Sequence, residues 1–137
     1  MLKARRVLET AIYCDDLAVT VRFYADLLAL TPMLESDRDV AFDAGEGTVL
    51  LLFQRGESAQ PLETPGGLVP GHSSSGPAHL AFAIDTSDLG KWLDRLEQLK
   101  VPVESRVVWK RGGQSIYFRD PDGRSVELAT PGTWPSY

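Results

Sequence analysis

The sequence predicts an α+β fold in which a strand–helix–strands unit occurs twice within 137 residues. Each half opens with a short run of strand-forming residues, at 7–14 (VLETAIYC) and 78–84 (AHLAFAI). Each run is followed by an amphipathic helical pattern, at 17–30 and 87–100. The same order of elements in both halves indicates an internal repeat.

The repeat is also visible in the spacing of individual residues. A shift of 70 residues places Glu9 on His79, and a shift of 76 places Gly47 on Gly123. With the second shift Leu51 falls on Glu127. A small insertion in the second half accounts for the change of offset, as expected for diverged modules.

In the first half, Asp15 and Asp16 follow the strand as a stop and a helix cap. The helix pattern of 17–30 ends at Thr31-Pro32. Its apolar positions recur at three- and four-residue spacing: Leu17, Val21, Tyr24, Leu27 and Leu28. Residues 39–53 then read as two strands with a Gly-rich turn at 44–47.

Residues 54–77 are rich in Pro, Gly and Ser and are predicted to form a long loop. The second half continues after its helix with three further strand-like runs, RVVW, SIYFRD and SVELAT, and Asp120–Gly123 (DPDG) makes a tight turn before the last of them. We therefore expect one domain over 1–137, with module one at about 5–55, a connecting loop at 56–76 and module two at about 77–131.

Composition limits the classes of function. Hydrophobic residues make up 43% and charged residues 24%, as in ordinary soluble domains. The net charge of −5 argues against nucleic-acid binding, and no apolar run approaches the ~20 residues of a membrane span. The N-terminus lacks the apolar core of a secretory signal, so we expect a cytoplasmic protein. Cys14 lies in an apolar strand and is expected to be buried and inert.

Strand alternation places three ionisable side chains on faces that carry small residues. Glu9 shares its face with Ala11 and Tyr13, His79 shares its face with two alanines, and Glu127 shares its face with Ser125 and Ala129. Leu8, Ile12, Phe82 and Ile84 point the other way and are expected beneath the helices. Singly, a strand-end Glu is usually exposed and a strand His usually structural. Together, the three suggest ligands of a shared divalent cation.

Other side chains are candidates for shaping such a site. Tyr13 is on the face of Glu9, and His72 in the Pro/Gly/Ser loop is either a proton-transferring group or an exposed loop residue. Trp109, Arg111 and Gln114 flank a Gly-Gly turn and suit either a planar or anionic substrate or protection of a sheet edge. Trp92 lies on the apolar helix face and is expected in the core.

Three segments carry a family resemblance: LETAIYCDDLAVTVRFYADLLAL, GPAHLAFAID and GGQSIYFRDPDGRSVELATP. They resemble the vicinal oxygen chelate superfamily, which includes glyoxalase I, extradiol dioxygenases, fosfomycin-modifying thiol transferases and bleomycin-resistance proteins. The resemblance implies two βαβββ modules whose curled sheets form a cupped site around a divalent metal, usually in a homodimer.

Carried over residue by residue, the resemblance implies metal ligands at Glu9, where the family usually has His, and at His79 and Glu127. The fourth glyoxalase-type position falls on Leu51, which cannot bind metal. The site therefore departs from the four-ligand glyoxalase pattern and from the iron triad of two His and one carboxylate. Its oxygen-rich ligands favour Mn, Mg, Ni or Zn over Fe.

The sequence therefore predicts a glyoxalase- or dioxygenase-like metalloenzyme that polarises vicinal oxygens of a small substrate, as an isomerase or lyase, a dioxygenase or a thiol transferase. The candidate catalytic groups are Glu127, Glu9, Tyr13 and His72. The alternative is a non-catalytic protein that sequesters an antibiotic, as in the bleomycin-resistance branch. Expected partners are a small molecule and a second copy of the chain, with no nucleic acid and no membrane.

Overall fold

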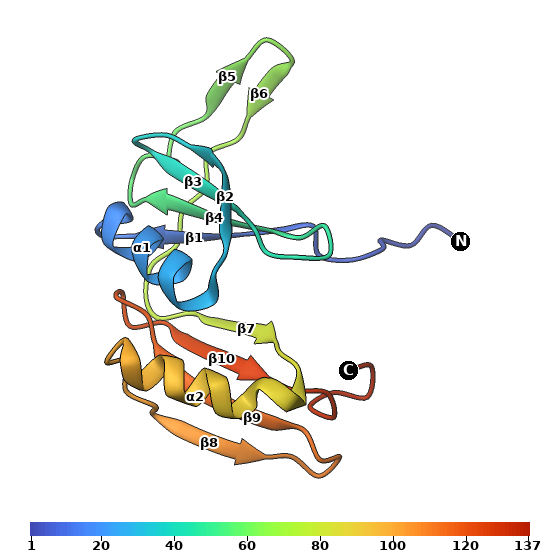
Figure 1. Cartoon of the computed structure of the whole chain (residues 1–137). Coiled ribbons are helices and arrows are strands. Elements are labelled where there is room, and N and C mark those ends of the chain that lie inside the picture. Colours follow the sequence, from blue (N-terminus) through green and yellow to red (C-terminus); the bar gives the residue numbers. More distant parts are fainter. The chain divides into compact units, whose positions relative to one another are not determined.

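The computed structural model describes residues 1–137 and divides the chain into two compact units, 1–75 and 76–137 (Figure 1). The first unit contains β1 (Glu9–Cys14), α1 (Leu17–Leu28), β2 (Thr31–Glu35), β3 (Asp39–Asp43), β4 (Val49–Gln54) and a hairpin of β5 (Leu62–Thr64) and β6 (Gly67–Val69). The second contains β7 (His79–Ala83), the short 3-10 helix η1 (Thr86–Asp88), α2 (Leu89–Gln98), β8 (Ser105–Val108), β9 (Gln114–Arg119) and β10 (Ser125–Ala129). The predicted pair of βαβββ modules is confirmed.

The two main sheets have matching topology. Their strand orders are β1-β4-β3-β2 and β7-β10-β9-β8, and the first two strands of each run parallel. Glu9 pairs with Val49 and Ala11 with Leu51 in the first sheet, as His79 pairs with Ser125 and Ala81 with Glu127 in the second. These pairs reproduce the offsets of 70 and 76 residues, so the internal repeat predicted from the sequence is present in the register of the strands.

Each helix covers one face of its own sheet. Asp16 caps α1 by accepting a hydrogen bond from the Val19 backbone N–H at 3.2 Å. Beneath the helices, Ile12 and Ile84 are buried and Phe82 is half-buried, as predicted. Leu8 was predicted there too, but it precedes the first residue of β1 and is 58% exposed.

The structure corrects two other expectations. The segment that follows the first helix, β2, was not predicted as a strand because Thr31-Pro32 was interpreted only as a helix end. β2 is an edge strand with an irregular register and all five residues exposed, so it lacks an alternating apolar signal. The predicted loop at 54–77 contains the β5–β6 hairpin, whose three-residue strands are too short to give a pattern.

The DPDG turn joins β9 to β10 through a buried ion cluster. Arg124, which is 4% exposed, donates to Asp120 at 2.8 Å and to Asp122 at 3.2 Å. Asp120 also accepts from the backbone N–H groups of Asp122 and Arg124, and Gly123 adopts a positive φ of 80°. The cluster fixes the conformation of the turn between the antiparallel strands β9 and β10.

None of the helices is long and apolar enough to span a membrane.

Candidate metal centre

The second unit brings together two of the predicted ligands. His79 begins β7 and Glu127 is the central residue of β10, and both side chains lie on the face of the sheet opposite α2. His79 Nε2 lies 3.2 Å from Glu127 Oε2. The carboxylate side chain is only 8% exposed, whereas the imidazole is 52% exposed, so the pair is open to solvent on the histidine side.

The other ring nitrogen of His79 determines what the pair can hold. Nδ1 lies 3.0 Å from the Ser125 backbone carbonyl, which can only accept, so Nδ1 carries a proton. In the neutral ring Nε2 then presents a lone pair to the carboxylate oxygen. Two acceptors at this distance repel each other, and a proton or a metal ion between them removes that repulsion. The ring is therefore oriented as a metal-ligating histidine usually is.

Glu127 is held by a chain of donors on its other oxygen. Ser115 donates to Oε1 at 2.5 Å and Tyr117 donates to it at 3.0 Å. The Trp109 indole N–H in turn donates to the Ser115 hydroxyl at 2.8 Å. These bonds compensate for burial of a carboxylate and leave Oε2 directed at His79.

Tyr117 remains a proton donor in this arrangement. Burial raises the pKa of its hydroxyl, and the hydrogen bond and negative charge of Glu127 raise that pKa further, against a smaller lowering by Ser115. Its ring also stacks on His79, with centroids 6.2 Å apart.

Ser115 and Tyr117 were not predicted as site residues, although the sequence holds a signal for them. The turn at 120–123 pairs Arg119 with Ser125, so counting back along both strands pairs Tyr117 with Glu127. The predicted turn therefore fixes which β9 residues share the face of Glu127. Trp109, predicted either to contact a substrate or to protect a sheet edge, donates to the Ser115 hydroxyl and so supports the carboxylate.

Glu9 lies in the first unit, where it begins β1 and is exposed. It occupies the position that His79 has in the second unit, while Leu51 occupies the position of Glu127. Neither unit alone gathers three or more His, Cys, Asp or Glu side chains that could hold a metal. The role of Glu9 as a third ligand therefore stays a prediction.

Tyr13 and His72 meet in the first unit. The Tyr13 hydroxyl lies 2.6 Å from His72 Nδ1, and the Phe53 ring contacts both, with centroids 6.1 Å from Tyr13 and 4.9 Å from His72. His72 is exposed, as one of the two predictions for it had it, and its ring is also held against the face of β1 that carries Glu9.

Hydrogen bonds to Ser58 and Arg55 hold the loop segment that carries His72. The His72 backbone N–H donates to the Ser58 carbonyl and the Ser58 hydroxyl donates to the His72 carbonyl, each at 2.8 Å. Arg55 donates to the Ser74 carbonyl and to the Tyr13 carbonyl and pairs with Asp15. These contacts hold the histidine in position on the aromatic pair.

The remaining candidates have other surroundings. Trp92, predicted to lie in the core, is only half-buried on α2, whose buried residue is Leu96. Arg111 is exposed in the turn before β9, and the backbone N–H of Gln114 donates to Thr130. Cys14 is a buried free thiol, as expected.

Comparison with known proteins supports one family. The sequence model of the Glyoxalase/Bleomycin resistance protein/Dioxygenase superfamily matches residues 6–128. The chain is 31% identical to the metallothiol transferase FosB of Staphylococcus saprophyticus over 118 residues, which cover 85% of this chain and 70% of that protein. It is 29% identical to the glutathione transferase FosA of Serratia marcescens over 131 residues, which cover 93% and 81%.

A solved structure gives the same result for the fold. The lactoylglutathione lyase from Agrobacterium tumefaciens superposes with a TM-score of 0.86 at 34% identity. The similarity covers 96% of this chain and 98% of that chain.

Proposed function

Since the chain belongs to the glyoxalase/bleomycin resistance protein/dioxygenase superfamily, we propose that it is a divalent-metal-dependent enzyme acting on a small, oxygen-rich substrate. The observation that carries this proposal is the contact of His79 Nε2 with Glu127 Oε2 at 3.2 Å. The other polar atom of each side chain is already hydrogen-bonded within the protein, His79 Nδ1 to the Ser125 carbonyl and Glu127 Oε1 to the Ser115 hydroxyl. We propose His79, Glu127 and Glu9 as the metal ligands.

The distance within the pair suits two ligands of one ion. Metal–nitrogen and metal–oxygen bonds of about 2.0–2.2 Å, at angles between octahedral and tetrahedral, separate neighbouring ligands by about 3.0–3.5 Å. The pair supplies one imidazole and one carboxylate, and Glu9 would add a second carboxylate. This mixed, oxygen-rich set fits Mn, Ni, Zn or Mg better than an iron site that activates dioxygen.

Bound metal would act as a Lewis acid that polarises a substrate oxygen. The residues of the chain supply the rest. Ser115 and Tyr117 hold Glu127 in place, and the Ser125 carbonyl fixes the ring of His79. We propose Tyr13 and His72 as the proton-transferring pair, because the imidazole nitrogen can take up the phenol proton as the phenol oxygen receives another.

Among the reactions of the family, we favour transfer of a small thiol. The relatives named above are a metallothiol transferase, a glutathione transferase and a lactoylglutathione lyase, and each name refers to a thiol or its adduct. Leu51 at the fourth ligand position disfavours the four-ligand glyoxalase reaction. A three-ligand site leaves coordination positions open for substrate oxygens.

The test begins with elemental analysis of protein purified without chelator, followed by thermal melts with Mn, Ni, Zn, Mg, Fe and Co. We expect one transition metal per chain and a melting temperature raised by the fitting ion. Loss of thiol would then be followed with glutathione or cysteine and an epoxide such as fosfomycin. His79→Ala should abolish both metal binding and thiol consumption. A melting temperature unchanged by every ion would contradict the proposal.

A second candidate rests on the aromatic cluster of Tyr13, Phe53 and His72. Stacked rings suit a planar ligand, so a non-catalytic protein that sequesters an aromatic antibiotic is the alternative. Metal distinguishes the two functions, since a sequestering protein would bind its ligand equally well in the presence of a chelator.

We also propose that two copies associate, because both main sheets are open, with edge strands β1 and β2 in the first and β7 and β8 in the second. Sedimentation at micromolar concentration should give the mass of a dimer, and a monomer would contradict this assembly.

A further inference from the structure

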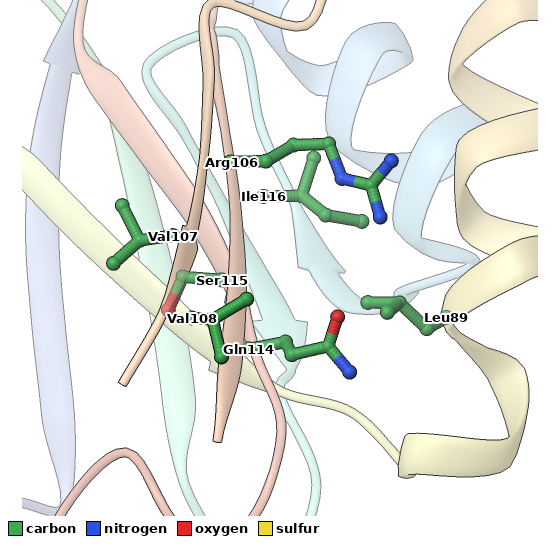
Figure 2. Close-up of a pocket in the computed structure, with 7 residues that line it drawn as sticks. All are labelled: Leu89, Arg106, Val107, Val108, Gln114, Ser115 and Ile116. Atoms are coloured by element: carbon green, nitrogen blue, oxygen red, sulfur yellow. The ribbon is translucent and has the colours of Figure 1, made fainter. Parts of the chain in front are cut away.

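The second unit has a pocket of about 340 Å³ on the helix side of its sheet. It lies between the first residue of α2 and the strands β8 and β9 (Figure 2). Its lining residues are Leu89, Arg106, Val107, Val108, Gln114, Ser115 and Ile116. The volume is at the lower end of the range for small-molecule sites, about 300–1,000 Å³.

The strand register separates this pocket from the candidate metal centre. Arg106 pairs with Ile116 and Val108 with Gln114, so these side chains share the face of the sheet that α2 covers. Figure 2 shows Arg106, Gln114 and Ile116 extending toward Leu89, while Ser115 points the other way. Because Ser115 donates to Glu127, the two sites lie on opposite faces of β9.

Two polar groups in the pocket have no partner within the protein. Neither the Arg106 guanidinium nor the side-chain amide of Gln114 makes a hydrogen bond or an ion pair, whereas Arg119, the other arginine within these two strands, pairs with Glu104. Asp88, the acid next to Leu89, is neutralised by Lys91 at 2.7 Å. The pocket therefore presents one uncompensated positive charge.

The remaining surface is apolar. Leu89 and Val108 supply accessible aliphatic side chains around the two polar groups, and the buried Ile116 lies beneath them. A guanidinium offers a planar pair of donors that matches a carboxylate, and the Gln114 amide N–H adds a third donor on the adjacent strand. The N-terminus of α2, which begins at Leu89, also favours negative charge.

We propose that this pocket is a second binding site, separate from the metal centre, for a small organic carboxylate with an apolar body. The carboxylate pairs with Arg106 and Gln114, and the apolar body lies against Leu89 and Val108.

The probe is sodium octanoate, titrated into the chelator-treated chain of 137 residues and followed by ¹H–¹⁵N correlation spectra. We expect saturable shifts in the amides of 106–108 and 114–116 and at Leu89, with millimolar or tighter affinity. Arg106→Gln should weaken binding about tenfold, the effect of losing one charge-assisted hydrogen bond. Its melting temperature should equal that of the wild type, since Arg106 has no partner to lose.

The matched control is Arg22→Gln, which removes an exposed arginine from α1 in the other unit and should leave the affinity unchanged. Octanol, which lacks the charge, should bind more weakly than octanoate. The proposal is overturned if Arg106→Gln binds as well as the wild type, if octanol equals octanoate, or if no shift saturates by about 10 mM. Shifts centred on His79 and Glu127 would also overturn it, by placing the carboxylate at the metal centre.

Discussion

Replacing Glu127 by Gln separates metal binding from folding. The amide has the shape of the carboxylate, and its oxygen can still accept from Ser115 and Tyr117. Its N–H can then donate to His79 Nε2, which now faces a donor instead of a carboxylate oxygen. We therefore expect the free energy of unfolding in chelator to change by no more than about 1 kcal/mol.

The metal response should differ sharply. If the fitting ion is present at a hundred times its dissociation constant, the wild type gains about 2.7 kcal/mol of stability, which raises the melting temperature of a chain this size by about 10 °C. Glu127→Gln should lose that gain, because an amide nitrogen does not ligate a divalent ion. Calorimetric melts with and without the ion measure both quantities.

The control for this experiment is Glu104→Gln, in the same unit. It removes the same charge from a half-exposed ion pair with Arg119, away from the centre, and should retain the full metal response. Retention of that response by Glu127→Gln would refute Glu127 as a ligand. A large loss of stability in chelator would instead show that the carboxylate acts mainly in the fold.

Three further results are expected. Ser115→Ala should weaken metal binding about 10- to 100-fold in a calorimetric titration, because a supporting bond to a ligand is lost; unchanged affinity would contradict that role. Arg124→Gln should cost about 3–5 kcal/mol in urea unfolding, since it leaves buried carboxylates uncompensated, and a cost below 1 kcal/mol would refute the cluster. Ultraviolet titration, with Tyr117→Phe as reference, should place the pKa of Tyr117 above its ordinary value. The stability that its proton contributes is therefore lost only at alkaline pH. Glu127→Gln should lower the pKa of Tyr117, and an unchanged pKa in that variant would count against the contact.

Periodicity explains how much of the fold was predictable. Alternation in VLETAIYC and AHLAFAI gives the faces of β1 and β7, and the DPDG turn gives the hairpin of β9 and β10. β2 was missed because an exposed edge strand has no apolar side to alternate. The β5–β6 hairpin was missed because three residues are too few to show a period.

The candidate site was predictable only in part, for a related reason. Strand alternation assigns His79 and Glu127 to a face, but their 3.2 Å contact depends on β7 and β10 being neighbours and on a parallel register that offsets them by two residues. The contact of Tyr13 with His72 depends on the path of a Pro/Gly/Ser segment fastened by Ser58. Such contacts come from tertiary packing, which periodicity does not report.

The differences between the two modules suggest a division of roles. In the second unit, the equivalent positions hold a histidine and a carboxylate that already face one another, whereas the first unit has Glu9 and Leu51. An exposed carboxylate next to an aliphatic residue cannot by itself replace the hydration shell of an ion. The same face of the first unit instead carries the rings of Tyr13 and Phe53, which suit the carbon skeleton of a ligand. We therefore expect substitutions at His79 and Glu127 to remove metal, and substitutions at Phe53 to weaken substrate binding while leaving metal content unchanged.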